Sequence, residues 1–481
     1  MSENGRLDLL LINPGGRVRI YQSLADTLSA IEPPVWAGLM ATFTRKRGLS
    51  VQIIDADADN LGPDEVAARA ADLNPVLTAV VAYGHQPSAS TQSMPASSAI
   101  CTSLKQTAPQ LKTLLVGGHV TSLPKRTLEE EDVDFVCGGE GPYTLVELTE
   151  ALKAGRPEDV SKVRGIWYRD GQQIRNTPPA PLVQDLDNEM PGLAWDLLPM
   201  DKYRAHNWHC FGDLQRQPYA AVYTTLGCPY HCSFCCIQAP FKEGSKVLGL
   251  GESVNAYRLW SPDAVMAQIA TLVEDYGVKN IKIADEMFVL NPRHVNSICD
   301  QIIERGYDLN IWAYARVDTV RAGMADKLKR AGFNWLAFGI EAADQVVRND
   351  VDKGFDQDLI FKTINEVKAA DINIGANYIF GLPEDDLASM RKTLDLAIEL
   401  NTEWANFYCT MAYPGSPLYN TAVKEAMPLP ATWSGYSQHA VDTLPLPTKH
   451  LTASQVLRFR DEAFQTYFTS PRFLDMVTEK F

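Results

Sequence analysis

Four of the nine cysteines in this chain fall close together, at Cys228, Cys232, Cys235 and Cys236. The first three have the spacing C-x3-C-x2-C and directly follow an apolar run at 220–227 that predicts a strand, so they share one loop. Thiolates are the usual ligands of iron–sulfur clusters, and a closed cubane cluster takes four of them. Three thiolates would leave one iron open to another molecule. The spacing therefore predicts an open [4Fe–4S] cluster held by Cys228, Cys232 and Cys235.

Zinc is the competing interpretation of this loop. Structural zinc sites take four ligands, typically from two C-x2–4-C pairs, and the sequence has no second pair. His231 and Cys236 could complete four ligands on paper, but the adjacent Cys235 and Cys236 point their side chains in different directions. The cluster is therefore the favoured hypothesis. The other five cysteines are expected to be small buried core residues.

Length and composition set broader bounds on the protein. The chain has 481 residues, which suggests two to four domains, and 46% of them are hydrophobic. Its net charge of −15 argues against a nucleic-acid partner, because phosphate binding draws on a basic surface. The N-terminus lacks the features of a signal peptide, and the apolar runs are too short to span a bilayer. We expect a cytoplasmic protein with reduced cysteines and no membrane span.

The first part of the chain alternates apolar runs with amphipathic stretches. Strands are predicted at 7–13, 51–55, 77–83, 113–118 and 134–139, with helical patterns at 33–48 and 63–73. Continuous apolar strands separated by helices indicate a doubly wound parallel sheet covered on both faces. This α/β domain is expected to span residues 1–155.

Glycine and polar residues follow several of these predicted strands. Ligands bind at the carboxyl ends of the strands in such sheets, and glycine lets a ligand approach the backbone closely. The alternative is that each glycine only allows a tight turn. The candidate ligand-binding residues are Pro14, Asp55, His85, Gly117, Gly118, Gly139, Glu140 and Gly141.

A hairpin around Asp170-Gly171 and a proline-rich stretch indicate a linker over 156–217. Strand and helix patterns then alternate again over 218–420, and six βα units suit a partial (β/α)6 barrel. Residues 421–481 are expected to be a small helical region, with a helix at 453–468. That region would either cover the barrel mouth or pack on its side.

The cysteine loop resembles the signature of the radical S-adenosylmethionine (SAM) superfamily, C-x3-C-x-aromatic-C, with Phe234 as the aromatic residue. The resemblance implies that the cluster cleaves SAM to a 5′-deoxyadenosyl radical. NYIFGLPE at 377–384 is similar to the family's G-x-I-x-G-x-x-E element, although Asn377 replaces its first glycine. Taken singly, each polar residue in these positions has an ordinary structural alternative. The residues expected to contact SAM are Phe234, Asp285, Glu286, Arg316, Glu341, Gly381 and Glu384.

A doubly wound domain before such a barrel resembles the cobalamin-binding class of this superfamily. The resemblance makes cobalamin the expected ligand of the strand-end residues given above and of the loop 84–91, which contains Ser88. The signature D-x-H-x-x-G is absent, since no histidine follows Asp55 at the required place, so no histidine of that motif ligates cobalt. His85 is better explained as an ordinary polar residue than as a cobalt ligand. The alternative is a degenerate domain without cofactor that serves substrate docking.

The resemblance implies a methyltransferase that acts on an unactivated carbon or a phosphinate centre of a small or medium-sized metabolite. One SAM would methylate cobalamin, and a second would supply the radical. Ring formation or rearrangement, as in anaerobic magnesium-protoporphyrin monomethyl ester cyclases, is the alternative. Methylthio transfer and a cofactor sensor rank lower. An electron donor such as flavodoxin or ferredoxin is the expected protein partner.

Overall fold

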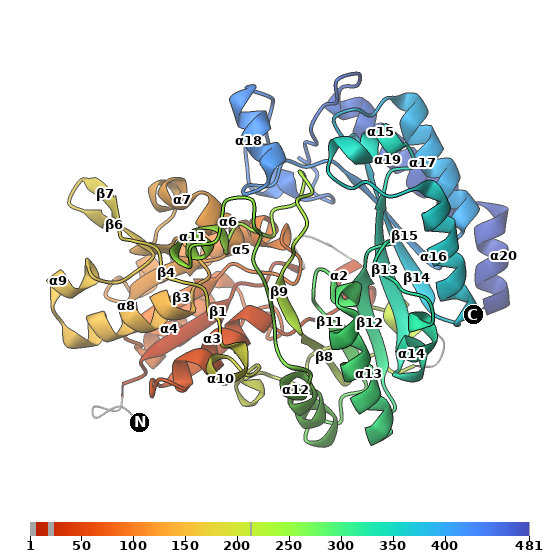
Figure 1. Cartoon of the computed structure of the whole chain (residues 1–481). Helices are drawn as coiled ribbons and strands as arrows, with labels where there is room; N and C mark the ends of the chain where they lie inside the picture. Colours follow the sequence, from red (N-terminus) through yellow and green to blue (C-terminus); the bar gives the residue numbers. More distant parts are fainter. Residues whose placement is uncertain (1–5, 18–23, 212–213, 481) are drawn as a thin grey trace.

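The structure is a computed structural model that describes residues 6–17, 24–211 and 214–480. Two α/β domains lie side by side, with the last two helices, over residues 453–480, beside the second (Figure 1). The N-terminal domain is built on a seven-stranded sheet with the order β2-β1-β3-β4-β5-β6-β7. Its first five strands are parallel, as predicted from the sequence. They are β1 (Leu9–Asn13), β2 (Val51–Asp55), β3 (Leu77–Val81), β4 (Lys112–Val116) and β5 (Phe135–Cys137).

Helices cover both faces of this sheet because its central strands are apolar on both sides. Leu9 and Leu11 of β1 belong to one core cluster with α3 and α8, whereas Leu10 and Ile12 belong to a second core cluster on the opposite face. The predicted doubly wound architecture is therefore confirmed. The helices are α2 (Leu24–Thr27), α3 (Val35–Arg45), α4 (Pro63–Leu73), α5 (Ala89–Thr107), α6 (Gly118–Ser122), α7 (Pro124–Glu130), α8 (Pro142–Ala154) and α9 (Pro157–Val160).

The predicted hairpin around Asp170-Gly171 is not a free linker segment. Its strands β6 (Ile166–Asp170) and β7 (Gln173–Asn176) continue the first sheet, because β6 pairs antiparallel with β5. The extended segment that follows includes the short helices α10 (Leu186–Glu189), η1 (Trp195–Leu197) and η2 (Trp208–Cys210). This segment joins the two domains.

The second domain is a six-stranded parallel half-barrel with the order β15-β14-β13-β12-β11-β8. This agrees with the partial barrel predicted from the sequence. Its strands are β8 (Tyr219–Val222), β11 (Asn280–Ile283), β12 (Asn310–Ala315), β13 (Phe333–Glu341), β14 (Asn373–Phe380) and β15 (Trp404–Cys409). Its helices are α11 (Lys242–Val247), α12 (Pro262–Glu274), η3 (Phe288–Leu290), α13 (Pro292–Arg305), α14 (Met324–Arg330), α15 (Gln345–Asp350), α16 (Gln357–Ala369) and α17 (Leu387–Leu400).

The first predicted barrel strand is broken into two pieces. After β8, the Thr224 amide and hydroxyl donate hydrogen bonds of 2.6 and 2.5 Å to the Asp285 carboxylate. The chain then leaves the sheet as β9 (Thr225–Gly227), which pairs antiparallel with β10 (Tyr257–Leu259). The buried Asp285 thus directs the chain toward the cysteine loop.

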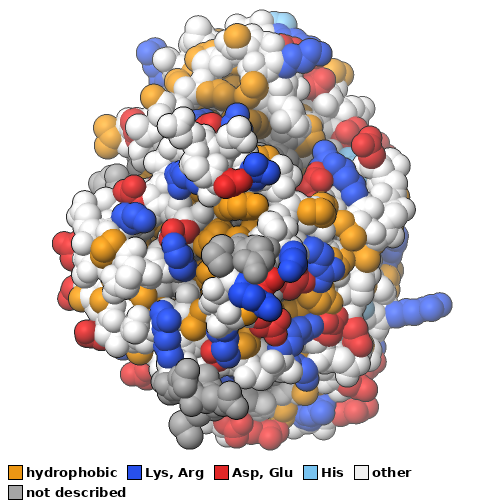
Figure 2. All heavy atoms as spheres, turned by 90° about the vertical axis from the view of Figure 1, so that its left-hand side faces the viewer, with side chains coloured by type: hydrophobic (Ala, Val, Ile, Leu, Met, Phe, Trp, Pro, Cys, Tyr) orange, Lys and Arg blue, Asp and Glu red, His pale blue; other side chains and the backbone are white. Residues whose placement is uncertain are grey.

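The C-terminal region contains α18 (Pro417–Lys424), η4 (Ser434–Tyr436), α19 (Ala453–Phe468) and α20 (Pro471–Lys480). Helix α19 packs beside β15, where Tyr467 donates a hydrogen bond of 2.6 Å to the Thr402 carbonyl (Figure 1). Among the described residues, no helix is long and apolar enough to cross a membrane. The face of the N-terminal domain in Figure 2 carries basic and acidic side chains intermingled.

One core cluster runs through both domains, and a buried ion pair joins them. The Arg258 guanidinium in β10 donates to both oxygens of Glu140, at 2.5 and 3.2 Å. The Glu140 carboxylate also accepts a hydrogen bond of 3.0 Å from the Val183 amide. The two charged side chains are only 9% and 3% exposed, so neither is well solvated if its partner is removed.

We expect Arg258→Met to lower the free energy of unfolding by about 3–5 kcal/mol, because it leaves the Glu140 charge buried without its partner. Urea unfolding followed by circular dichroism measures this change. The double variant Glu140→Gln, Arg258→Met is expected to recover part of the loss. Equal destabilisation in the single and double variants would contradict the electrostatic explanation.

Candidate functional site

A cavity of about 900 Å³ lies between the two domains. The N-terminal domain contributes residues near positions 28–32 and 85–92 to its wall, and the connecting segment contributes residues 206–208. Lys282 of β11, residues of β12 to β15, His439 and residues of α19 between 460 and 465 form the rest. The helical C-terminal region therefore packs beside the barrel and also closes this cavity. The space is large enough for a sizeable ligand, and it opens between the carboxyl ends of the first sheet and the concave face of the half-barrel.

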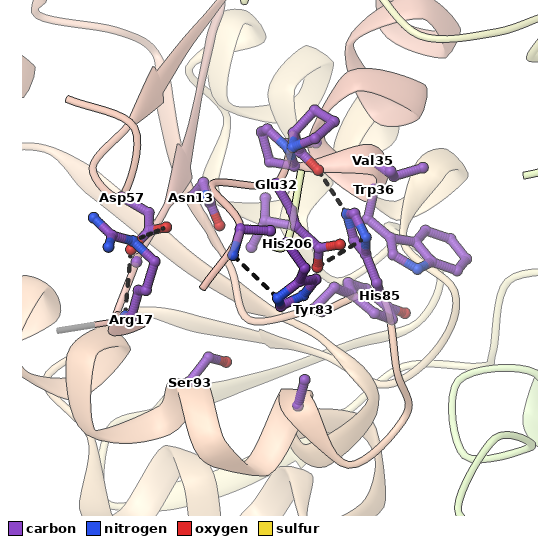
Figure 3. Close-up of a pocket in the computed structure, with 18 residues that line it drawn as sticks. Asn13, Arg17, Glu32, Val35, Trp36, Asp57, Tyr83, His85, Ser93 and His206 are labelled. Carbon is purple, nitrogen blue, oxygen red and sulfur yellow. Dashed lines mark hydrogen bonds and ion pairs between the residues drawn. The ribbon is translucent and has the colours of Figure 1, made fainter. Parts of the chain in front are cut away.

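A second cavity of about 180 Å³ lies at the carboxyl ends of β1 to β3 (Figure 3). Its wall includes Asn13, Arg17 and Asp57, and it shares Glu32, His85 and His206 with the larger cavity. These shared residues make the two cavities neighbours. The predicted ligand-binding edge of the first sheet is therefore hollow in the structure.

Glu32 holds a cluster of polar side chains between the two cavities. Its carboxylate accepts hydrogen bonds from Lys282 Nζ at 2.8 Å and from the Tyr219 hydroxyl at 2.9 Å, and His85 Nδ1 lies 3.1 Å away. Burial alone would raise the pKa of Glu32, but His85 and Lys282 hold that pKa well below its usual value. The cluster ties the N-terminal domain to β8 and β11.

Neither histidine in this region presents a free ring nitrogen lone pair. His85 directs Nε2 to the Pro33 carbonyl at 2.7 Å and Nδ1 to Glu32 (Figure 3). His206 Nδ1 accepts a hydrogen bond of 3.2 Å from the Ala30 amide, so a neutral ring carries its proton on the other nitrogen. Burial lowers the pKa of His206 to about 4, which keeps this ring neutral. Both side chains act as structural polar residues in this arrangement.

The cysteine loop is fixed at both ends by its backbone. Gly227 has a φ of +87°, and a Cβ there would collide with the Ala256 carbonyl oxygen, so only glycine fits before the first cysteine. Gln238 donates a hydrogen bond of 2.8 Å to the Cys228 carbonyl and accepts one of 3.0 Å from the Ala256 amide. The loop is thereby held against β10.

The three thiols of the loop lie close enough to influence one another. Burial raises the pKa of Cys228 to about 11 and the pKa of Cys235 well above its usual value, and neighbouring thiols add to both shifts. Arg316 approaches Cys232, with 4.0 Å between Nη1 and Sγ, and the charges of Lys353 and Arg316 oppose the rise in the Cys232 pKa. Thiols in such surroundings become ligands only when bound iron stabilises their thiolates.

Among the described residues, no group of three or more His, Cys, Asp and Glu side chains is placed to hold one metal ion. A cubane cluster does not require such a group, since each thiolate binds a different iron. All nine cysteines are free thiols. The five outside the loop are buried, as expected from the sequence: Cys101, Cys137, Cys210, Cys299 and Cys409.

Among the carboxylates predicted to contact SAM, Glu286 differs from the others. Its Oε2 atom is buried without a hydrogen-bond partner among the described residues, and burial raises its pKa to about 8. It lines a narrow cavity that also contacts Cys236 and Gly118. The neighbouring Asp285 is fully buried and is occupied by Thr224. A carboxylate without a partner beside the cysteine loop suits a ligand ammonium group.

The other predicted SAM residues have partners within the protein. Arg316 donates a hydrogen bond of 2.8 Å to Asp318, and Glu341 forms a buried ion pair with Lys353. Glu384 forms an ion pair with Lys449 near the surface. The amide of Gly381 donates to Asp385 at 3.0 Å. Phe234 packs between two small apolar clusters. Their contacts with SAM stay predictions.

Some of the predicted cobalamin residues face cavities or open space, and others are glycines that the packing requires. His85 and Gly118 face cavities, and a Cβ on Gly139 would meet open space. Gly117 and Gly141 are needed for packing, since a Cβ would strike the Ala82 carbonyl or Met40 and Val116.

Four further cobalamin candidates either have partners within the protein or lie outside the cavity walls described above. Asp55 is buried and accepts hydrogen bonds of 2.7 Å from both Tyr203 and Asn13, while Glu140 is occupied by Arg258. Pro14 is buried outside the walls of the cavities described above, and Ser88 precedes α5. Contact of any of these residues with cobalamin stays a prediction.

Sequence reasoning missed Glu32, Lys282, Trp312 and His206, all of which line the large cavity. Lys282 carried a signal, since strand alternation places its side chain on the face opposite Ile281 and Ile283. No local signal marked Glu32, because its partner lies 250 residues away along the chain.

Two family models match the chain in the order that the fold suggests. The B12 binding domain matches residues 21–149, and the Radical SAM superfamily matches residues 222–397. This chain belongs to the cobalamin-binding radical SAM enzymes.

Two curated relatives extend this family assignment along most of the chain. The chain is 28% identical to an uncharacterized methyltransferase of Pyrococcus horikoshii, covering 95% of this chain and 94% of that protein. It is 25% identical to the anaerobic magnesium-protoporphyrin IX monomethyl ester cyclase of Cereibacter sphaeroides, covering 83% of this chain and 62% of the cyclase.

Solved structures of two cobalamin-dependent radical SAM proteins share the fold. The radical SAM methyltransferase TsrM from Kitasatospora setae, with cobalamin and a [4Fe–4S] cluster bound, superposes with a TM-score of 0.69 at 14% identity, over 96% of this chain and 89% of TsrM. OxsB with aqua-cobalamin bound gives a TM-score of 0.67 at 17% identity, over 96% of this chain and 66% of OxsB. At these identities the likeness shows the fold.

The cofactors of this radical SAM family are a [4Fe–4S] cluster, SAM and cobalamin, and the residues present fit all three. Cys228, Cys232 and Cys235 would hold the cluster beside the cationic Arg316 and Lys353. The unpartnered Glu286 oxygen would receive the SAM ammonium group. The hollow edge of the first sheet and the adjoining large cavity offer space for cobalamin.

We expect Glu286→Gln to weaken SAM binding by about tenfold, because a charge-assisted hydrogen bond to the ammonium group is lost. Equilibrium dialysis of SAM against cluster-loaded protein measures this. Glu129→Gln is the matched control, since Glu129 is exposed on the N-terminal domain in a pair with Lys125 outside every predicted site, and its SAM affinity should stay unchanged. An equal loss in Glu129→Gln and Glu286→Gln would contradict the assignment.

Proposed function

We propose that this protein is a cobalamin-dependent radical SAM methyltransferase that methylates an unactivated carbon, or a phosphinate centre, of a small or medium-sized metabolite. One observation carries the proposal: the cavity of about 900 Å³ is walled by both cofactor domains, so a substrate held in it lies between them. The relatives named as methyltransferases support methyl transfer over ring formation.

When bound, the cluster supplies the electron that cleaves SAM, and cobalamin carries the methyl group. The chain itself positions and shields these groups. The Gly227 turn and Gln238 fix the cysteine loop, and Arg316 and Lys353 place positive charge beside its thiols. Glu286 supplies a carboxylate for the ammonium end of SAM. The helix α19 closes the cavity from the side, which limits the access of water to a reactive radical.

Reductive cleavage of SAM consumes one electron, which the cluster must receive from a donor. We include in the proposal a one-electron donor protein such as flavodoxin or ferredoxin. No catalytic acid or base is assigned, since hydrogen abstraction by a radical needs neither.

The test is a product analysis of protein loaded without oxygen with iron, sulfide and hydroxocobalamin, then given SAM and a strong reductant. We expect both 5′-deoxyadenosine and S-adenosylhomocysteine, with the second product depending on cobalamin. Cys232→Ala should abolish 5′-deoxyadenosine formation, whereas Cys236→Ala, beside the last ligand, should retain it. Mass spectrometry quantifies both products.

If only 5′-deoxyadenosine formed in the fully loaded protein, methyl transfer would be wrong and a cyclase or rearrangement would replace it. If Cys232→Ala made 5′-deoxyadenosine at the parental rate, the cluster assignment itself would fail.

A further inference from the structure

We propose that the barrel end of the large cavity binds a neutral, ring-containing and largely apolar substrate, and that Trp312 donates a hydrogen bond from its indole nitrogen to an oxygen atom of that substrate. The inference rests on the proposed function, because it assigns a substrate class to the same cavity. Three observations on the cavity wall carry it.

The first observation is a cluster of tryptophans, formed by Trp208, Trp312 and Trp335. The ring of Trp208, from the connecting segment, lies 5.1 Å from Trp312 and 5.1 Å from Trp335, in edge-on arrangements with both. Trp404 lies further along the cavity at the start of β15. From Trp404 to Tyr408 the wall follows β15 for about 13 Å, at ~3.3 Å per residue. The rings of Trp404, Phe407 and Tyr408, together with the tryptophan cluster, give the wall aromatic surface that suits a ring-shaped apolar body.

The second observation is that the charges on the described part of the cavity wall are already paired. Lys282 pairs with Glu32, whose other oxygen contacts His85 Nδ1, and Arg460 pairs with Asp461 at 2.6 Å. Burial lowers the pKa values of His206 and His439, so both rings are neutral. A buried ionised group on the substrate would find no free counter-charge among these side chains, and burying an unpaired charge is costly. The part of the substrate inside the cavity is therefore neutral.

The amide groups in the wall form their own chain of hydrogen bonds. Trp404 donates at 2.9 Å to Asn406, which donates at 2.9 Å to Asn377, which in turn donates at 3.2 Å to the Phe338 carbonyl. These side chains form part of the wall, and their hydrogen bonds to one another do not depend on a ligand.

The third observation is an unsatisfied hydrogen-bond donor in the described part of the wall. Trp312 is 3% exposed, and its Nε1 atom has no hydrogen-bond partner among the described residues. Lys282 Nζ lies 4.9 Å from the ring centre of Trp312 and holds the ring from one side. An indole N–H can only donate, and a buried donor without an acceptor costs free energy. A hydroxyl, carbonyl or ether oxygen on the substrate would satisfy it.

The test measures the binding of three small probes to cluster- and cobalamin-loaded protein by equilibrium dialysis. The probes share one ring system: tetralin is a hydrocarbon, 1-tetralone adds an acceptor oxygen, and 1,2,3,4-tetrahydro-1-naphthoate adds an anion. We expect 1-tetralone to bind most tightly and the anion least tightly. In Trp312→Phe, which keeps an aromatic ring but loses the donor, tetralone affinity should fall by about 5- to 10-fold while tetralin affinity stays unchanged.

Trp433→Phe is the matched control, because Trp433 packs on His119 and Arg126 outside the cavity, and it should bind all three probes like the parent. Unchanged thermal unfolding of Trp312→Phe confirms its fold. The inference is overturned if the anion binds as tightly as the ketone, if no probe binds, or if Trp312→Phe does not reduce tetralone binding selectively. It is also overturned if the probes bind only when cobalamin is absent, since Trp312 would then face the cofactor. The formation of S-adenosylhomocysteine without substrate tests the methyltransferase separately from this result.

Discussion

The buried ion pair between Glu32 and Lys282 sets the relation between the two domains. Glu32 belongs to the N-terminal domain, and Lys282 lies in β11 of the half-barrel, where its side chain is 3% exposed. A buried ammonium group needs a carboxylate close by, and this one also receives Tyr219 from β8. The first sheet must therefore present its carboxyl edge to the concave face of the half-barrel. The large cavity is the space that this arrangement encloses.

Pairing of opposite charges also organises the surroundings of the cysteine loop. Three thiolates and an electron-rich cluster need nearby cations, and Arg316 at the end of β12 and Lys353 after α15 provide them. Asp318 pairs with Arg316, and Glu341 pairs with Lys353. Glu286 is the exception, with a buried oxygen that lacks a partner in the described part of the chain. The neighbouring charged side chains are paired, so a carboxylate oxygen without a partner indicates a group that binds a ligand. Glu286 lines the narrow cavity beside the loop.

Much of the architecture could be predicted from the sequence because its signals are local. The apolar runs of β1 to β4 and the spacing of Cys228, Cys232 and Cys235 need only neighbouring residues to be recognised. The hairpin β6–β7 was predicted, but its place on the edge of the first sheet was not, because pairing with β5 depends on the tertiary fold. The break after β8 depends on Asp285, which lies 61 residues beyond Thr224. Glu140, a predicted cobalamin contact, pairs with Arg258, a partner that no local pattern reveals.

The central claim is that the cluster and cobalamin are bound close together by the two domains of a single chain. Electron paramagnetic resonance of protein carrying both the reduced cluster and cob(II)alamin tests this most directly. If the two centres lie close together, their unpaired spins should couple, and the spectrum should be broadened or split relative to protein loaded with either cofactor alone. A spectrum equal to the simple sum of the two separate signals would place the cofactors apart and contradict the account.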